Sequence, residues 1–413
     1  MTTAASYTFT GLANRTLIAN FAIKPLAVTN LEFSANTVSV SFNRPIDASV
    51  LNLASFTLLG STSGLTSGSL LLGPLTNKVT FIATAGPFAP GTYTLTLAST
   101  GFEDMQGNFL NSSSNGVAGS PYTNQFTILS SAARTIALPS FCRGPGQWVN
   151  VPATDSSIPI AIGEGSNVVS VSLILNYDTN LLNITGVSLD KSAPAGWRLT
   201  NSFSPMGTLS ITAVGATPLN SGSVTFARLQ ARVPWCAGYG SMDMLTINSA
   251  QLNGGTIPAT GESAAQLVAY LGDVDGNRAY TTNDAALVAQ FAVGLIDHFP
   301  AYPLADVILA SDISSDGKVT VYDAALIAQK AIGHTVVSMP DLPLVNVEIQ
   351  KSANQVTLSW PQCVGNYVLE ISPTLGAAAN WNVVTNNPVL VGDQITVNVN
   401  ATTQGQFFRI IPQ

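Results

Sequence analysis

The chain has 413 residues and a formal net charge of −7, and 46% of its residues are hydrophobic while only 9% are charged. This length exceeds what one hydrophobic core supports and predicts three or four domains. The acidic balance, without a clustered Lys/Arg face, excludes nucleic acid as a partner, and no apolar run approaches the ~18 residues of a transmembrane segment.

Residues 1–24 are expected to form an extended segment outside any domain. Aromatic and aliphatic side chains alternate with polar ones there, which suits a strand that adds to the edge of a sheet. Two alternatives stay open for this segment. It folds back on its own chain, or it enters a neighbouring molecule, in which case copies of the chain would form a head-to-tail homopolymer.

Residues 25–130 contain short alternating strands separated by Gly, Pro, Asn and Ser, a pattern that predicts a β-sandwich. The segments NTVSVSFNRPIDASVLNLASFTL and GFEDMQGNFLN resemble the bacterial Ig-like domains of surface-layer and adhesive proteins. Asp104 and Asn108 in the second segment carry oxygen atoms of the kind that bind metals. We interpret them instead as a turn held by Asx hydrogen bonds.

Residues 131–268 are expected to form a second β unit. Its most telling parts are a Y-D-x-x-x-L segment, formed by Tyr177, Asp178 and Leu182, and a late LNGG. With the runs IPIAIGEGSNVVSVSLILNYDTNLLNITGVSL and LSITAVGATPLNSGSVTFARLQARVP, these features resemble a cohesin domain. The resemblance implies a nine-stranded β-sandwich with jelly-roll topology.

The three cysteines bear on the compartment in which the protein works. Cys142 and Cys236 flank the second β unit, whereas Cys363 lies in a later one. A Cys142–Cys236 disulfide suits an oxidising compartment. The alternative is that these two cysteines remain buried thiols that behave as small hydrophobic side chains.

Residues 269–340 contain two near-identical stretches, GDVDGNRAYTTNDAALVAQFAVG and SDISSDGKVTVYDAALIAQKAIG, each an oxygen-rich loop followed by a short apolar helix. Their donors fall at positions 1, 3, 5, 7, 9 and 12 of a calcium loop, with position 7 using its backbone carbonyl. In the first loop these residues are Asp273, Asp275, Asn277, Ala279, Thr281 and Asp284. In the second loop they are Asp312, Ser314, Asp316, Lys318, Thr320 and Asp323.

Position 6 of such a loop needs a sharp turn, which Gly317 supplies in the second loop and Arg278 supplies under strain in the first. The alternative to calcium binding is that the aspartates only cap helices and stabilise turns. The duplication, with Asp284 and Asp323 in the last position instead of Glu, resembles the dockerin module of cellulosomes and of exported bacterial and archaeal proteins.

The dockerin resemblance implies two Ca2+ ions as cofactors and a cohesin as partner, in the same chain or another. In dockerins the residues at positions 10 and 11, often Ser-Thr, help to select the cohesin. Here these positions hold Thr282–Asn283 and Val321–Tyr322, which argues against a standard cellulosomal partner. Because such loops fill at extracellular calcium levels, we expect an exported protein whose signal peptide is not present in this sequence.

Residues 341–413 are expected to form a last small β domain. VTLSWP, YVLEIS, NWNVV and the terminal FFRIIP resemble a fibronectin-III-type module of secreted bacterial proteins. Trp360 and Trp381 have the size and shape to stack on sugars, and so to bind a polysaccharide. We interpret them instead as core residues of the sandwich.

No catalytic set is recognisable in the sequence. Its two histidines, His298 and His334, have no nucleophile motif nearby, and there is no phosphate-binding, dinucleotide or zinc-protease motif. Four acidic residues qualify for glycoside hydrolysis only by type, in domains too small to provide a cleft: Glu103, Asp104, Glu164 and Asp178. We therefore predict a protein that is not an enzyme.

The expected fold is mainly β, with tandem β-sandwich domains and a small α-helical, dockerin-like calcium-binding module. The first functional hypothesis is an extracellular structural protein that self-assembles into a calcium-stabilised cell-surface filament or matrix. The alternative hypothesis is an exported carbohydrate-binding or scaffold-docking protein of the cellulosome-like type.

Overall fold

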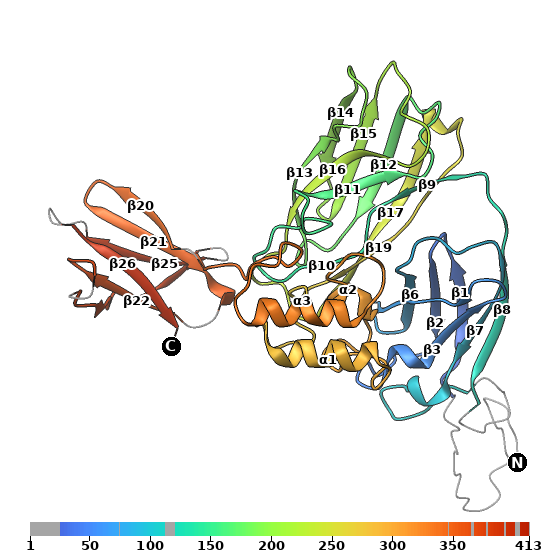
Figure 1. Ribbon diagram of the computed structural model, residues 1–413, viewed down its shortest axis with the longest axis horizontal. Coiled ribbons are helices and arrows are strands. Elements are labelled where there is room, and N and C mark those ends of the chain that lie inside the picture. Colours follow the sequence, from blue (N-terminus) through green and yellow to red (C-terminus); the bar gives the residue numbers. More distant parts are fainter. Residues whose placement is uncertain are drawn as a thin grey trace, which may run out of the picture.

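The computed structural model describes residues 25–73, 75–111, 120–345, 347–364, 367–376, 379–391, 394–400 and 405–412. The architecture is mainly β, as predicted, with β-sandwiches on either side of a small helical unit along the chain (Figure 1). The N-terminal segment expected at residues 1–24 lies outside the described residues. No helix in the described part of the chain is long and apolar enough to cross a membrane.

The first sandwich consists of two four-stranded sheets with the strand orders β1-β2-β6-β5 and β4-β3-β7-β8. Alternate side chains such as Val38, Val40, Leu58 and Leu95 point into the space between the sheets and are fully buried. The strands of this sandwich are β1 (Val28–Phe33), β2 (Thr37–Phe42), β3 (Phe56–Gly60), β4 (Gly64–Leu65), β5 (Gly68–Leu72), β6 (Lys78–Ala83), β7 (Gly91–Leu97) and β8 (Tyr122–Ile128).

The turn that was expected at Asp104 is present. Asp104 Oδ1 accepts hydrogen bonds from the backbone N–H groups of Gln106 at 2.9 Å and Asn108 at 3.0 Å. Its Oδ2 pairs with the guanidinium of Arg44 at 3.0 Å. The carboxylate therefore stabilises a turn, as the Asx interpretation predicts.

The second sandwich has a six-stranded sheet, β10-β19-β17-β12-β15-β14, facing a five-stranded sheet, β13-β16-β11-β9-β18. The cohesin resemblance implied nine strands, and eleven are present between residues 134 and 267. They are β9 (Arg134–Ala137), β10 (Phe141–Cys142), β11 (Ile158–Ile162), β12 (Ser170–Asn176), β13 (Asn183–Leu189), β14 (Arg198–Phe203), β15 (Thr208–Val214), β16 (Val224–Arg232), β17 (Met242–Leu252), β18 (Ala259–Gly261) and β19 (Ala264–Leu267).

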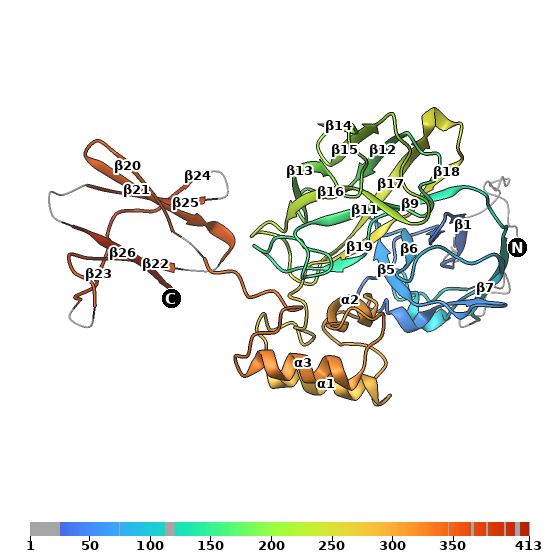
Figure 2. The same cartoon turned by 45° about the horizontal axis from the view of Figure 1, so that its top comes forward.

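The helical unit consists of α1 (Thr282–Ala292), α2 (Val307–Ser311) and α3 (Val321–Ala331). α1 and α3 lie side by side in both views (Figures 1 and 2). Val288 of α1 and Ile327 of α3 are fully buried in their common core. Each of these two helices begins with a capping box, formed by Thr281 with Asp284 and by Thr320 with Asp323.

One hydrophobic core joins the helical unit to both preceding sandwiches. Leu71 and Ile82 of the first sandwich, Cys142 and Leu267 of the second, and Val274 of the first calcium-like loop belong to the same cluster. Figure 2 shows the helical unit beneath the second sandwich and beside the first. The three parts therefore form one packed body.

Hydrogen bonds between these three parts reinforce the shared core. The N–H of Leu70 donates to the carbonyl of Leu304 at 2.8 Å, which ties the first sandwich to the helical unit. Asn36 and Ser263 exchange two bonds, from Asn36 Nδ2 to the Ser263 carbonyl at 2.8 Å and from the Ser263 N–H to Asn36 Oδ1 at 3.0 Å. Both of these residues are buried, so the two sandwiches meet without free polar groups at this point.

The last β domain extends away from this body (Figure 1). It has one sheet with the order β20-β21-β25-β24 and one with the order β23-β22-β26. Trp360 is 1% exposed in its core, as predicted. The same prediction is wrong for Trp381, which is half-buried outside that core, with its ring 4.3 Å from the guanidinium carbon of Arg409. The strands are β20 (Glu348–Ser352), β21 (Gln355–Pro361), β22 (Tyr367–Ser372), β23 (Asn382–Val383), β24 (Val389–Val391), β25 (Gln394–Asn400) and β26 (Phe407–Pro412).

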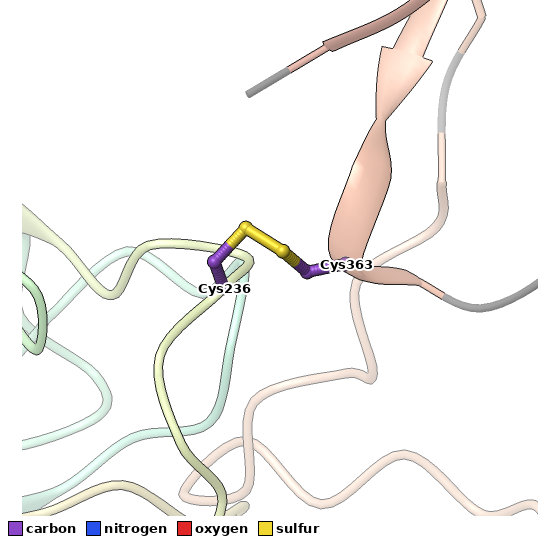
Figure 3. The surroundings of a disulfide bond; sticks show 2 residues. All are labelled: Cys236 and Cys363. Atoms are coloured by element: carbon purple, nitrogen blue, oxygen red, sulfur yellow. A yellow bond between two sulfur atoms is a disulfide. The ribbon is translucent and has the colours of Figure 1, made fainter. Parts of the chain in front are cut away.

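The disulfide expected between Cys142 and Cys236 is wrong. Cys236 is bonded to Cys363 of the last domain, with their Cα atoms 4.9 Å apart (Figure 3). Cys142 is a free, buried thiol whose Sγ donates to the carbonyl of Ala269 at 3.0 Å. The reason is that β10 pairs with β19 inside the shared core, whereas Cys236 lies in the loop after β16 that faces the last domain.

Candidate metal centre

The first loop gathers three carboxylates at the start of α1. One oxygen each from Asp273, Asp275 and Asp284 can be chosen so that all three lie within 4.8 Å of one another. Asp273 and Asp284 are fully buried, and Asp275 is half-buried. The donors expected at positions 1, 3 and 12 therefore converge on one point.

Hydrogen bonds from the loop backbone hold these carboxylates in place. Asp273 Oδ1 accepts from the N–H groups of Gly276 at 2.9 Å and Asn277 at 3.1 Å. Asp284 Oδ1 accepts from the N–H groups of Val274 at 3.0 Å and Asp275 at 3.1 Å. The chain is thus wound around the carboxylates, as a loop that encloses a cation requires.

The remaining predicted ligands of the first loop lie around the same centre. Asn277 Oδ1 accepts from the N–H of Ala279 at 2.8 Å, and Asn277 Nδ2 donates to Asp275 Oδ2 at 3.0 Å. The hydroxyl of Thr281 donates to Asp284 Oδ2 at 2.8 Å. The loop therefore brings positions 5 and 9 next to the carboxylates, and position 7 is tied to position 5 through its N–H.

The second loop repeats these interactions in a more exposed setting. Asp312 Oδ2 accepts from the N–H of Gly317 at 2.9 Å, and Asp323 Oδ1 accepts from the N–H of Ser314 at 2.9 Å. Asp316 Oδ1 accepts from the N–H of Lys318 at 2.9 Å, and both of these residues are exposed. Among the described residues, three carboxylates gather within 4.8 Å in the first loop and not in the second.

The aspartates that close the two loops also cap α1 and α3. Thr320 donates to Asp323 Oδ2 through its N–H at 2.9 Å and its hydroxyl at 3.0 Å, and Thr281 and Asp284 repeat this arrangement. The capping interpretation therefore describes positions 9 and 12 correctly. Asp275 lies outside the capping box, and its Oδ1 accepts from the N–H of Asn277 at 3.0 Å, as the turn interpretation predicts. Its carboxylate also joins the cluster, which a turn alone does not require.

Electrostatics disfavour ionisation of the two buried carboxylates of the first loop without a cation, whereas hydrogen bonds, including one from Asn283, outweigh burial and lower the pKa of Asp275. Burial raises the pKa of Asp273 to about 6, and the nearby charge of Asp284 adds to this effect, although the hydroxyl of Tyr239 opposes it. Burial also raises the pKa of Asp284. A hard divalent cation would relieve this repulsion, and the oxygen-only donor set of the loop fits Ca2+.

Tyr239 is a component of this centre that sequence analysis missed. It lies in the loop between β16 and β17 of the second sandwich, and its hydroxyl donates to Asp273 Oδ2. The guanidinium carbon of Arg278 lies 5.0 Å from the centre of its ring. No local motif connects Tyr239 with the calcium loop, because packing between domains creates the contact.

The acidic residues considered for glycoside hydrolysis have structural partners instead. Asp104 holds its turn, and Glu103 is half-buried beside it. Glu164 Oε1 accepts from the N–H groups of Ser166 at 2.8 Å and Gly222 at 3.0 Å. Asp178 Oδ1 accepts from the N–H of Asn180 at 2.8 Å.

The outer face of the six-stranded sheet is a second candidate site. Ile174 of β12 lies opposite Ser210 of β15, which lies opposite Ser202 of β14. The next row across these strands is Ser172, Thr212 and Thr200, and the row after it is Ser170, Val214 and Arg198. We call these nine residues the hydroxyl face.

The hydroxyl face is accessible and combines polar and apolar groups. Ile174 is 38% exposed and has Ser210 beside it, and Val214 is 50% exposed between Ser170 and Arg198. The hydroxyls of Ser172 and Thr212 lie 2.9 Å apart. In both views β14 and β15 lie at the opposite end of the sandwich from α1 and α3 (Figures 1 and 2).

Comparison with known proteins finds solved structures similar to part of the chain, but no family for the whole of it. No protein-family model matches the chain, and no curated protein matches it. The solved structures that align with it include cohesin modules, which cover about a third of its length.

Three of these cohesins illustrate the likeness. The sixth cohesin of Acetivibrio cellulolyticus scaffoldin B, in complex with a Cel5 dockerin, has 15% identity and a TM-score of 0.28, covering 33% of this chain and 99% of its own. A non-cellulosomal cohesin from Archaeoglobus fulgidus has 16% identity and a TM-score of 0.28, covering 33% and 91%. The cohesin module of a Clostridium perfringens family 33 glycoside hydrolase has 12% identity and a TM-score of 0.25, covering 33% and 93%.

Proposed function

We propose that this chain is an extracellular scaffold-docking protein without enzymatic activity, whose hydroxyl face binds a dockerin-type module of another molecule. The observation that carries the proposal is the hydroxyl face itself, a flat sheet surface with exposed Ile174 and Val214. The two apolar side chains offer area to bury, and the surrounding hydroxyls offer hydrogen bonds to a protein partner. The cohesin resemblance of the sequence gives the class of partner.

The dockerin-like unit of the same chain leaves this face accessible. It packs at the other end of the sandwich, where α2 contacts β10 and its core includes Cys142, Ala265 and Leu267. Contact between the cohesin-like and dockerin-like units within one chain therefore occurs away from the hydroxyl face. A dockerin-type module from another molecule would find that face free.

Calcium binding by both loops belongs to this proposal. The convergence of Asp273, Asp275 and Asp284 supports the first site, and the equivalent hydrogen bonds of Asp312 and Asp323 support the second. The ions would keep the helical unit folded between the two sandwiches. The disulfide between Cys236 and Cys363 supports an oxidising, extracellular location.

The other functions predicted from the sequence have less support. Self-assembly into a filament depends on residues 1–24, which lie outside the described residues, and the solved cohesins point to docking instead. A sugar platform formed by Trp360 and Trp381 does not fit, because Trp360 is buried and Arg409 lies over Trp381. Scaffold docking is therefore the function that we propose.

A binding experiment with the full chain tests docking. The chain is immobilised in calcium, and a panel of purified dockerin modules is passed over it by surface plasmon resonance. We expect at least one micromolar or tighter partner, and Ile174→Asp should weaken its binding by about thirtyfold, or about 2 kcal/mol. Leu65→Asp, an exposed site on the first sandwich, is the matched control and should bind normally.

Two outcomes would contradict the docking function. The first is that no dockerin of the panel binds at concentrations of about 100 μM. The second is that a dockerin binds equally well to the wild type and to the Ile174→Asp variant, which would place the interface elsewhere. Melting curves of both variants show whether the substitutions leave the fold intact.

A further inference from the structure

The first calcium loop is completed by a residue of another domain. The hydroxyl of Tyr239, in the loop between β16 and β17, donates to Asp273 Oδ2 and accepts from the backbone N–H of Tyr270 at 3.0 Å. The carbonyl of Asp273 accepts from the hydroxyl of Tyr302 at 2.9 Å. The residue at position 1 of the loop is therefore fixed from the second sandwich as well as from its own unit.

Each oxygen of Asp273 has its own set of donors. Oδ1 accepts from the N–H groups of Gly276 and Asn277, both in the calcium loop. Oδ2 accepts from the N–H of Arg278 at 2.7 Å and from the hydroxyl of Tyr239. Because Asp273 is fully buried, these donors determine how its carboxylate is turned toward Asp275 and Asp284.

Arg278 explains why the two loops differ at position 6. Its backbone has a φ of 66°, a left-handed conformation that favours glycine, and the second loop has Gly317 there with a φ of 78°. The Arg278 side chain lies over the ring of Tyr239 at 5.0 Å, a favourable cation–π geometry. A Cβ added at Gly317 would meet open space. The loop with arginine at position 6 is therefore the one that contacts the second sandwich, through Tyr239.

We propose that Tyr239 is a positioning residue of the first calcium site and that Arg278 holds its ring in place. This inference rests on the proposed binding of calcium by the first loop. Calcium affinity at that loop then depends on the seating of the β16–β17 loop against it. By thermodynamic linkage, calcium bound at Asp273 in turn stabilises the seated loop.

The β16–β17 loop also connects the site with the last domain. Cys236 precedes Tyr239 in the loop and is bonded to Cys363. Tyr239 and Arg278 line a cavity of about 500 Å³ whose other walls include Trp235, Leu342 and Tyr367. Calcium at the first site would therefore restrain the β16–β17 loop, to which the last domain is bonded through the disulfide between Cys236 and Cys363.

Calcium titration of two variants tests the positioning role. Both carry Asp312→Ala, which removes the second site, and one also carries Tyr239→Phe, which keeps the ring under Arg278 and removes only the hydroxyl. We expect the Tyr239→Phe variant to bind calcium about tenfold more weakly by isothermal calorimetry, as when outer-shell partners of metal ligands are removed. Tyr177→Phe, in the same sandwich, is the matched control and should change nothing.

The outcomes separate this inference from the proposed function. Equal affinity with and without the Tyr239 hydroxyl overturns the positioning role while leaving calcium binding intact. Absence of calcium binding in the Asp312→Ala protein itself would overturn the proposed first site instead.

A second measurement does not depend on how the Tyr239 variant folds. In the Asp312→Ala protein, calcium should slow amide hydrogen exchange in residues 233–241 by about tenfold or more and leave strands β1 and β2 unchanged. If contact with the β16–β17 loop raises calcium affinity about tenfold, then bound calcium must favour that contact by the same factor. Unchanged exchange in residues 233–241 would overturn the coupling.

Discussion

The carboxylate of Asp306 accepts a hydrogen bond from the hydroxyl of Thr84, which links the helical unit to the first sandwich. Asp306 also accepts from the N–H of Ile308 at 3.2 Å, and its own N–H donates to Ser69 Oγ at 2.8 Å. The residue is buried and belongs to the boundary between the two units. Its protonation state therefore affects how firmly they are joined.

The first prediction concerns pH. Burial raises the pKa of Asp306 above its ordinary value of 3.8. Its neutral form therefore stabilises the fold below pH 3.8, and this contribution is lost as pH rises through the folded-state pKa. Asp306→Asn cannot ionise, so we expect its melting temperature, relative to wild type, to increase from pH 4 to pH 8. Differential scanning calorimetry across this range measures the effect.

Asp341→Asn is the matched control for this prediction. The side chain of Asp341 is 93% exposed and pairs with Lys330, so its substitution controls for the loss of one carboxylate at the surface. A melting temperature of Asp306→Asn that falls relative to wild type as pH rises would show that the charged carboxylate is the stabilising form.

The second prediction concerns removal of calcium. Chelator should lower the melting temperature of the wild type, because it removes the cations that stabilise both folded loops and that offset the repulsion of the crowded carboxylates in the first. At a free concentration of a hundred times Kd, one site contributes about 2.7 kcal/mol of stability. Asp273→Ala combined with Asp312→Ala should lower the melting temperature and abolish the response to chelator.

Asp47→Ala, at an exposed turn of the first sandwich, serves as the control and should respond to chelator like wild type. If EDTA leaves the melting curve of the wild type unchanged, the loops do not bind calcium with useful affinity.

The third prediction concerns the cysteines. Peptide mapping without reductant should find Cys236 linked to Cys363, and Cys142 as a free thiol. Burial raises the pKa of the Cys142 thiol to about 12, so iodoacetamide at pH 8 should label it only after denaturation. Cys363→Ser should speed proteolysis in residues 340–347, since the last domain then loses its covalent tie to the body.

Cys142→Ser is the control and should leave the linkage of the last domain intact. A cross-linked peptide containing Cys142 would contradict the arrangement of the thiols in the structure. Equal proteolysis of the wild type and Cys363→Ser would show that the tie does not restrain the last domain.

Local patterns predicted the fold class well. In β12 the buried side chains Val171, Leu173 and Leu175 alternate with Ser170, Ser172, Ile174 and Asn176 on the opposite face, as a strand of a sandwich requires. The convergence of Asp273 and Asp284 could also be foreseen, because both lie in one short loop whose spacing brings them together.

Contacts between domains were not predictable from the sequence. Cys236 finds Cys363, and Tyr239 finds Asp273, only after whole domains have packed against one another. Neither pair shows a local spacing or periodicity that could reveal it. For the same reason Cys142 was paired with Cys236, whereas Cys142 lies in the two-residue strand β10 inside the core that the sandwiches share with the helical unit.

The bond between Cys236 and Cys363 closes a ring of backbone that spans 127 positions and contains the whole helical unit with both calcium-like loops. A protease that cuts the chain once inside this ring therefore opens it without releasing either part. The nicked protein would remain one covalent molecule until the disulfide is reduced. In the exported protein that we propose, the ring would preserve the connection between the packed body and the last domain after such damage.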